Sequence, residues 1–506
     1  MREALAEIML CPFCMKGGLE VRAAARDGLE ITEGSLLCRA CGNEYAVSDG
    51  MAYLHRKDYT WTGLVDTEAR GWGERNVPGP TEMWNRLPFH GEGIQDDWGR
   101  SYWRIQARAF IFNVGVLSGL VEDEGGIFLE PGAQTGWVAK HLSRVFPSMT
   151  GVATDVFDDR GSGLGVCKGL IEMEGVYFER VIQDIHTQLL ADGSVSFVYG
   201  DNTLHHYRFL EEAMCSLASM LRRDGVFVGI EPIVPFWVDK RTLEEADANW
   251  RDFRIKERCY YFTDYIEAFE RAGLSNIVMV PYHVTDPRER RRLRFDPKAM
   301  LPYYPVGLKT RRLVEEKRAC KRLFDEMASY TSDEFEKKAR LGEQPLLYAL
   351  IFASRERDLT GLADYFADLQ ENAEKTAERV IPYGEAIEAD DGLQEVTFSI
   401  SLAVRDPASD EPVLRLRLLT PDGRVAADKT VLGYQFGGAS GPRDFSFLLY
   451  GDEVDGLRPH ATALEGGCDL RVEAVRVCRL PEFSPIRSTA LYETIAKLYG
   501  LRKQGG

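Results

Sequence analysis

Four cysteines in two pairs are the clearest chemical signal in the chain. They are Cys11 with Cys14 and Cys38 with Cys41, so each pair has the spacing CxxC. Each CxxC places two thiolates on one tight turn, and two facing turns provide the four-sulfur set that zinc prefers. The alternatives are chance pairs or a redox dithiol, but thioredoxin-type motifs stand singly beside a βαβ unit. The spacing therefore favours a closed, structural zinc site.

The residues around the cysteines fit a zinc ribbon. Gly17 and Gly18 follow the first pair and Gly42 follows the second, where such turns need a positive φ. Residues 19–22 and 29–31 alternate apolar and polar side chains, which predicts two short strands. The other six cysteines are scattered singly, so a disulfide framework is not expected.

A second chemical signal is a glycine turn followed by acids at the ends of predicted strands. Gly132 and Gly136 frame a turn that opens a helix, and Asp155 ends the next strand. A glycine turn lets the backbone approach a ligand and aims the amides of the helix at negative charge. An acid in the position of Asp155 accepts both hydroxyls of a ribose. These features alone suit NAD as well as other nucleotide-like cofactors.

The elements that must position these residues alternate between strand and helix. Short apolar strands are predicted at 127–130, 149–155, 178–183, 195–199, 225–232 and 275–281, with helices between them. This order specifies an α/β fold, a doubly wound Rossmann-like sheet with ligands at the carboxyl ends of its strands. We assign an antiparallel seventh strand to 346–353.

Length and charge limit the class of protein. The 506 residues predict about three domains. The formal charge of −17, from 62 basic and 79 acidic residues, gives no general attraction to nucleic acid or anionic lipid. No run approaches the ~20 apolar residues that span a bilayer, and acids at the N-terminus do not fit a secretory signal. A cytoplasmic protein without a membrane span is the expectation.

Residues 9–54 resemble the small zinc-ribbon proteins that activate methyltransferases. The resemblance rests on Cys-Pro-x-Cys, a second Cys-x-x-Cys-Gly and the ending Tyr45-Ala46-Val47-Ser48-Asp49-Gly50-Met51. Ala46 stands where that family usually has proline. The resemblance implies that Cys11, Cys14, Cys38 and Cys41 bind a structural Zn2+.

Residues from about 105 to 285 resemble a class I S-adenosylmethionine-dependent methyltransferase of the quinone-biosynthesis-like group. The matching series is Leu129-Glu130-x-Gly132-x-x-x-Gly136, Ala153-Thr154-Asp155, Gln183-Asp184-Ile185, Leu204-His205-His206 and Leu221 to Val226. The resemblance implies that Glu130, Gly132 and Gly136 line the methionine part of S-adenosylmethionine. It also implies that Asp155 holds the ribose diol and Asp184 accepts from the adenine amino group.

Two positions depart from that family. Gln134 stands where a third glycine is usual, and it either donates to the methionine carboxylate or narrows the pocket by its bulk. Ser196 stands on the fourth strand where the family usually has Asp. The departures leave open a scaffold that has lost its cofactor, although the remaining landmarks favour a working site.

Three residues are candidates for catalysis. A hydroxyl nucleophile benefits from a base, and His205 or His206 at the mouth of the fourth strand suits that role. Glu231, beyond the fifth strand, is a comparable candidate. The alternatives are a histidine that packs on or caps the next helix, and a glutamate in a strand-end salt bridge.

The sequence divides into seven segments. They are a zinc ribbon at 1–56, a linker with a helical approach at 57–104, a methyltransferase domain at 105–285 and 344–357, a helical insertion at 286–343, a helical connector at 358–382, a β-sandwich at 383–482 and a C-terminal helix at 483–506. The period-two alternation after Tyr383 predicts the sandwich, which resembles accessory domains that recognise glycans. The insertion opens with five arginines between Arg288 and Arg294, able to meet an anionic group or to form a solvated face.

These features favour methyl transfer to a small-molecule or saccharide acceptor, with a sugar hydroxyl in surface-glycan assembly as the leading case. A non-catalytic binding or assembly protein on a degenerate fold is the second hypothesis. RNA methylation is the third, and the acidic charge argues against it. A homo-oligomer is compatible with the terminal helix, which we expect to dock on this chain or on a second subunit.

Overall fold

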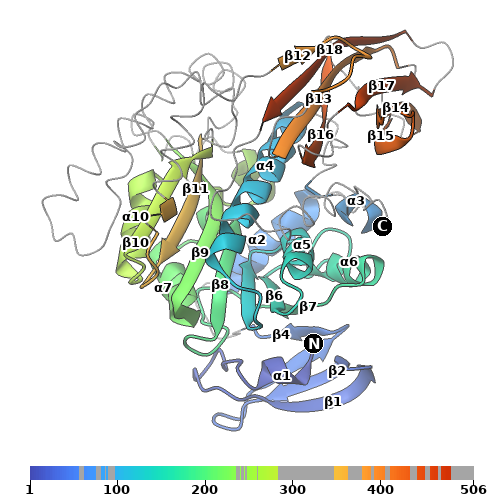
Figure 1. The fold of residues 1–506 in the computed structure, drawn as a ribbon. Helices are drawn as coiled ribbons and strands as arrows, with labels where there is room; N and C mark the ends of the chain where they lie inside the picture. Colours follow the sequence, from blue (N-terminus) through green and yellow to red (C-terminus); the bar gives the residue numbers. More distant parts are fainter. Residues whose placement is uncertain are drawn as a thin grey trace, which may run out of the picture. The chain divides into compact units, whose positions relative to one another are not determined.

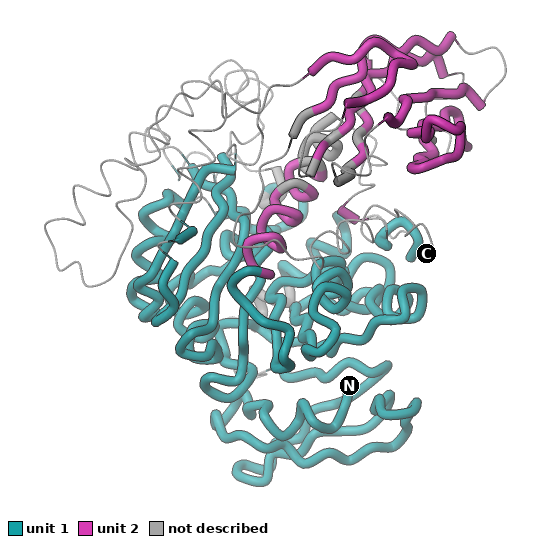
Figure 2. Tube along the Cα trace, viewed as in Figure 1, with its two compact units in different colours: residues 1–85, 119–284, 293–367 teal, residues 86–118, 285–292, 368–506 magenta. Residues whose placement is uncertain are grey.

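The computed structural model resolves two compact units (Figure 2). Unit 1 comprises residues 1–85, 119–284 and 293–367, and unit 2 comprises residues 86–118, 285–292 and 368–506. The structure describes residues 1–55, 62–75, 81–85, 87–88, 97–234, 240, 244, 248–258, 260–282, 347–359, 361–362, 379–388, 393–404, 411–432, 442–450, 456–464 and 469–479.

Unit 1 is built on one continuous sheet with the order β1-β2-β3-β4-β7-β6-β5-β8-β9-β11-β10 (Figure 1). Its central strands β5 to β9 run parallel, and β11 is antiparallel to both β9 and β10. These strands are β5 (Ile127–Pro131), β6 (Thr150–Asp155), β7 (Phe178–Ile182), β8 (Val195–Asp201), β9 (Leu221–Ile233), β10 (Asn276–Pro281) and β11 (Leu347–Ser354). The predicted α/β fold and its antiparallel seventh strand are confirmed. Parallel strands buried on both faces account for their continuous apolar runs.

Helices cover both faces of the parallel strands in Figure 1, with α5 and α6 on one side and α7 and α10 on the other. Their apolar residues recur at helical spacing, so each helix buries one face against the sheet. The helices of unit 1 are α1 (Glu3–Ala6), α2 (Thr62–Arg75), α3 (Thr81–Asn85), α5 (Trp137–Val145), α6 (Cys167–Glu174), α7 (Leu210–Met220), α9 (Ala248–Phe253) and α10 (Phe262–Arg271).

The N-terminal ribbon extends the same sheet. Its strands are β1 (Glu20–Asp27), β2 (Glu30–Leu37), β3 (Glu44–Ser48) and β4 (Met51–Tyr53). β4 pairs parallel with β7, with Met51 opposite Arg180 and Tyr53 opposite Ile182. Arg180 is buried and donates to Glu30 at 2.7 Å. The ribbon therefore covers what would otherwise be an edge strand of the methyltransferase sheet.

One lysine of this unit lies in the core. Lys140 of α5 is fully buried, and its Nζ donates to the carbonyl oxygen and the Oδ1 of Asn85 at 2.5 and 3.1 Å. Burial, with the nearby Arg144, lowers the pKa of Lys140 to about 7. An unfolded lysine titrates near 10.4, so between pH 7 and about 10 the unfolded chain binds up to one more proton than the folded chain. The burial of this lysine therefore destabilises the fold at low pH, and the penalty falls as the pH rises above 7.

We expect Lys140→Met to remove this pH dependence. The stability of the wild type, measured by denaturant unfolding, should rise relative to Lys140→Met by about 1.4 kcal/mol per pH unit between pH 7 and 9. Lys16→Met, at an exposed lysine, should keep the wild-type profile. Parallel profiles for wild type and Lys140→Met would contradict the buried, neutral amine.

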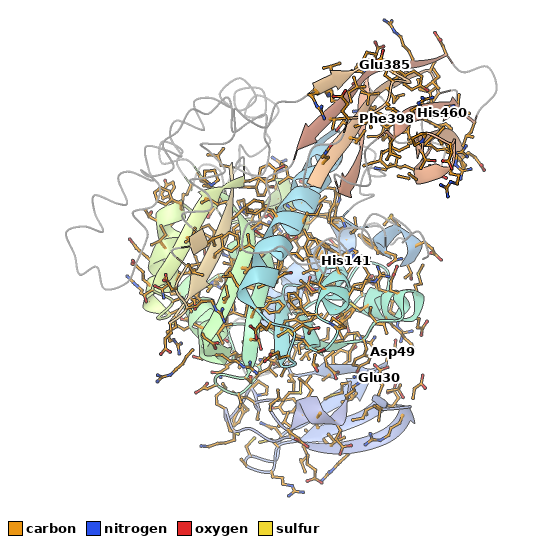
Figure 3. All side chains as sticks on the ribbon, viewed as in Figure 1. Glu30, Asp49, His141, Glu385, Phe398 and His460 are labelled. Atoms are coloured by element: carbon orange, nitrogen blue, oxygen red, sulfur yellow. The ribbon has the colours of Figure 1, made fainter. Side chains whose placement is uncertain are left out.

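Unit 2 contains most of α4 (Asp97–Leu120) and two antiparallel sheets, ordered β12-β18-β13-β16 and β15-β14-β17. The strands are β12 (Arg379–Ile381), β13 (Leu393–Leu402), β14 (Pro412–Leu419), β15 (Val425–Leu432), β16 (Arg443–Tyr450), β17 (Arg458–Ala463) and β18 (Leu470–Arg479). Side chains of both sheets share one core, with Phe398 (labelled in Figure 3) and Leu416 fully buried in it. Two sheets around one core agree with the predicted sandwich.

Several predictions meet the structure only in part. The end of the predicted helical connector is strand β12, which pairs with β18. The insertion 286–343 with its arginines and the C-terminal helix 483–506 lie outside the described residues. Among the described helices, not one combines the length and apolar composition of a bilayer-spanning segment.

Candidate cofactor, catalytic and zinc sites

The turn between β5 and α5 has the open backbone that a bound cofactor needs. Gly132 and Gly136 have φ values of 63° and 70°, and Gly132 is exposed. Gln134, the departure from the family glycine, has a φ of 47° and so adopts the left-handed conformation without being glycine. Its amide donates to Asp155 Oδ2 at 2.7 Å, which stabilises this conformation. Gln134 therefore keeps a glycine-like backbone.

Three acids predicted to bind the cofactor lie at the ends of neighbouring parallel strands. Asp155 at the end of β6 accepts from the amides of Gln134, Val156 and Phe157. Glu130 in β5 is buried and accepts from the amide of Ala139, in the first turn of α5, at 2.7 Å. Burial raises the pKa of both carboxyls, although the amides oppose it. Glu130 thus supports the glycine turn from inside.

Asp184 follows β7 and is paired with His186, which was not among the predicted site residues. Its Oδ1 lies 2.6 Å from His186 Nδ1 and accepts from the His186 amide at 3.0 Å. His186 Nε2 accepts from the amide of Phe209 at 3.3 Å, so the ring bridges two loops at the same edge of the sheet. The spacing of Asp184 and His186, two residues apart after a strand, was the available signal.

Glu231 holds the turn that carries the two predicted catalytic histidines. It is fully buried, and its Oε1 accepts from the amides of Thr203 and Leu204 at 2.9 and 2.8 Å. Its Oε2 lies 2.9 Å from His205 Nδ1. These contacts make Glu231 a positioning residue for the 3-10 turn Leu204–His206; a direct role in catalysis stays a prediction.

His205 and His206 converge on one carboxylate that no motif had indicated. Glu257 Oε2 lies 3.0 Å from His205 Nε2 and 3.7 Å from His206 Nε2. Glu257 precedes α10, and the Arg258 amide donates to the His205 carbonyl at 3.2 Å, which joins this segment to the histidine turn. On the other side, Glu68 of α2 lies 3.7 Å from His206 Nδ1.

The two carboxylates around His205 change its expected chemistry. Burial lowers the pKa of His205, but the hydrogen bonds to Glu231 and Glu257 outweigh it and raise the pKa to about 9. Burial also opposes ionisation of Glu257, yet the facing His206 and His205 lower its pKa. As long as no cation replaces the proton on Nε2, His205 stays protonated at neutral pH and makes a poor general base; the base role predicted for either histidine stays untested.

Asp201, at the end of β8, is a further acid in this region. Burial and the neighbouring Glu231 raise its pKa to about 8. Ser196, the other departure from the family, is buried in the same strand, away from the strand ends that carry the acids.

The four predicted zinc ligands come together in the ribbon. Cys11 and Cys41 Sγ are 3.6 Å apart and Cys14 and Cys38 Sγ are 3.5 Å apart, and all four lie within 4.8 Å of one another. A zinc ion 2.3 Å from each sulfur would set them about 3.8 Å apart. The donor set therefore fits a tetrahedral zinc ion.

The two cysteine turns have matching backbones. The amides of Met15 and Gly42 donate to the carbonyls of Cys11 and Cys38, each at 2.8 Å. Met15 has a φ of 57° and Gly42 a φ of 76°. Gly42 was predicted to take this conformation, but in the first turn Met15 takes it, and Gly18 adopts positive φ later. Tyr45 hydroxyl lies 3.0 Å from Cys11 Sγ and is placed to stabilise a thiolate.

Comparison with known protein families identifies two domains in the chain. Residues 102–278 match the family described as a methyltransferase domain, and residues 2–50 match the Trm112p-like protein family. No curated protein matches the chain.

Two solved structures illustrate the similarity in fold. Geranyl diphosphate C-methyltransferase from Streptomyces coelicolor A3(2), solved with Mg2+, geranyl diphosphate and S-adenosyl-L-homocysteine, is 14% identical; the match covers 58% of this chain and 98% of that one, with a TM-score of 0.37. A phosphoethanolamine N-methyltransferase from Haemonchus contortus is 13% identical, over 48% of this chain and 52% of that one, with a TM-score of 0.33. The two family matches show that the chain carries an S-adenosylmethionine-dependent methyltransferase domain in residues 102–278 and a Trm112p-like zinc-ribbon domain in residues 2–50.

Proposed function

We propose that the chain transfers a methyl group from S-adenosylmethionine to a hydroxyl of a small-molecule acceptor, with a saccharide as the leading class. One observation carries the proposal: the turn that bears His205 and His206 lies directly against the glycine turn. A Cβ on Gly132 would come 1.9 Å from Thr203 Oγ1, so the two turns are in van der Waals contact. The two histidines, which are candidates to bind the acceptor, thus lie beside the backbone that would hold the cofactor.

The residues present fit the cofactor. The exposed Gly132 backbone and the first amides of α5 suit the methionine carboxylate. Asp155 uses one lone pair of Oδ2 for Gln134, which leaves the other free to accept from a ribose hydroxyl. When bound, the cofactor supplies an electrophilic methyl on a sulfonium, and the chain has to align the acceptor with it in a dry pocket.

The acceptor class has separate support. The buried histidine–glutamate cluster is polar and positioned by hydrogen bonds, as expected for a site that binds a hydroxyl rather than an apolar carbon. The resemblance of the C-terminal sequence to accessory domains that recognise glycans favours a saccharide. The charge of −17 argues against RNA. Free thiols and a four-thiolate zinc site are typical of a reducing compartment and support a cytoplasmic location.

Asp155→Ala tests the cofactor assignment. We expect calorimetric titration of the zinc-loaded protein to show binding of S-adenosylmethionine, and Asp155→Ala to weaken it by roughly 10- to 100-fold, because a charge-assisted hydrogen bond to the ribose is lost. Glu172→Gln removes the same charge from an exposed site on α6 and should bind as the wild type does. No heat from the wild type at saturating cofactor would overturn the proposed function.

The acceptor class is tested with labelled cofactor. Transfer of label to a monosaccharide or nucleotide-sugar panel supports a hydroxyl acceptor on a saccharide. Label that enters RNA instead, with none in the sugars, would replace this proposal by the RNA alternative.

A further inference from the structure

We propose that His205, His206 and Glu257 form a divalent-metal site, separate from the zinc ribbon, that binds the acceptor oxygen. One possible donor atom of each of the three residues lies within 4.8 Å of the other two. The carboxylate is 3.0 and 3.7 Å from the two nitrogens. Ligands about 2.1 Å from a shared cation lie roughly 3.0 to 3.4 Å apart, so small movements suffice to close the set.

The second observation is that both rings are oriented in the same way. Each histidine turns Nε2 toward Glu257 and Nδ1 toward a further carboxylate: Glu231 at 2.9 Å from His205, and Glu68 at 3.7 Å from His206. Histidines that bind metals usually donate the other ring N–H to a carboxylate in this manner, which fixes the tautomer with its lone pair on the metal side.

The support for His205 is rigid, because Glu231 is itself held by the amides of Thr203 and Leu204.

The surroundings of His206 favour a bound cation at its Nε2. Its Nδ1 and Glu68 Oε1 are both buried from solvent, and neither has a hydrogen-bond partner among the described residues. Their separation of 3.7 Å is slightly too long for a hydrogen bond. A cation on Nε2 would draw this ring and Glu68 into the arrangement that His205 already has with Glu231.

Charge favours a cation as well. Three carboxylates, Glu68, Glu231 and Glu257, surround the two imidazoles. Two positive groups lie nearby: Arg258 donates to the His206 carbonyl oxygen, and Arg75 packs over the ring of Trp72 at 5.0 Å.

The donor set selects the metal. Two imidazoles and one carboxylate suit Zn2+, Fe2+, Co2+ or Ni2+ better than Mg2+ or Ca2+, which prefer oxygen ligands. Three protein ligands leave a coordination position open, as in catalytic rather than structural sites. A hydroxyl bound there would release its proton to solvent more easily, and its oxygen would then form the bond to the methyl carbon as the sulfur–methyl bond breaks and S-adenosylhomocysteine leaves. This role rests on the proposed methyl transfer, whereas metal binding itself does not.

Cobalt binding tests the site without measuring activity. We expect zinc-loaded protein titrated with Co2+ to bind one further ion per chain and to show d–d absorption. A thiolate-to-cobalt band should be absent, because such a band would mean that cobalt has exchanged into the cysteine site of the ribbon. Glu257→Gln and His206→Gln should each weaken binding at least about 100-fold, and Glu231→Gln about 10- to 100-fold. His460→Ala, at an exposed histidine of unit 2 (labelled in Figure 3), should bind as the wild type does.

The outcomes separate this site from the proposed function. Equal Co2+ affinity in wild type and Glu257→Gln, or no further ion in the wild type, overturns the metal site. If the metal site fails while S-adenosylmethionine still binds, methyl transfer stands without it. If Co2+ binds but the cofactor does not, the metal site stands and its role in methyl transfer falls.

Discussion

Loss of the ribbon zinc is expected to lower the thermal midpoint of the whole methyltransferase domain by roughly 10 °C. Structural zinc supplies much of the folding free energy of such small modules. Strand β4 of the ribbon pairs with β7, so unfolding of the ribbon exposes β7 as an edge of the larger sheet. It also removes Glu30, the partner of the buried Arg180, and an unpaired buried charge costs about 3 kcal/mol or more.

A further ion pair joins the ribbon to α6, since Asp49 accepts from Lys168 at 2.7 Å. Figure 3 labels Glu30 and Asp49 on the ribbon.

The Cys38→Ser/Cys41→Ser double variant is the specific test. Elemental analysis should show one zinc fewer per chain than in the wild type, and the thermal midpoint should fall. Cys215→Ser, at an exposed cysteine of α7, controls for cysteine loss and should change neither value. A double variant with unchanged zinc would refute the ligand set. Normal stability without that zinc would instead show that the ribbon does not support the sheet.

Gly132→Ala is expected to destabilise unit 1 by about 2 kcal/mol more than Gly175→Ala does. The two glycines have the same φ of 63°, so the backbone strain of an added side chain is matched. At Gly175 a Cβ meets nothing within 4 Å, whereas at Gly132 it would lie 1.9 Å from Thr203 Oγ1 and 2.8 Å from Thr203 Cβ. Thr203 cannot retreat easily, because Glu231 holds its amide at 2.9 Å.

The cofactor should report the same displacement. If the glycine turn moves away from Thr203, the backbone of the turn and Asp155 leave their positions. We therefore expect the affinity for S-adenosylmethionine to fall by 10-fold or more in Gly132→Ala and to stay unchanged in Gly175→Ala. Thr203→Gly in the same chain removes both contacts and should restore part of the stability, measured as a coupling in a double-mutant cycle. Equal unfolding free energies for Gly132→Ala and Gly175→Ala would show that the turns are not in firm contact.

The candidate cofactor acids could be selected from the sequence because they follow predicted strands, and the structure places them at strand ends. Asp155 and Asp184 each follow a short apolar run, and parallel strands bring their carboxyl ends to one edge. The structure adds what these carboxylates do without a ligand: Asp155 holds the Gln134 amide, and Asp184 holds His186. Those partners depend on loop conformation, which apolar periodicity does not describe.

The sequence by itself indicated the four cysteines of the candidate zinc site, the succession of strands along the chain and the glycine turn, because each depends on spacings of a few residues along the chain. Only the tertiary structure decided that Glu68 and Glu257 join His205 and His206. Glu68 lies more than 130 positions before these histidines and Glu257 more than 50 positions after them, in segments without a recognisable motif.

The same holds for two backbone features. Met15 and Gln134 adopt the left-handed conformation that a sequence pattern assigns to glycine. In each case a hydrogen bond accompanies the strained residue, from the Met15 amide to Cys11 and from the Gln134 amide to Asp155. The left-handed conformation costs a residue other than glycine roughly 1 to 2 kcal/mol. A hydrogen bond that forms only in the folded chain contributes a similar free energy and is enough to offset this cost.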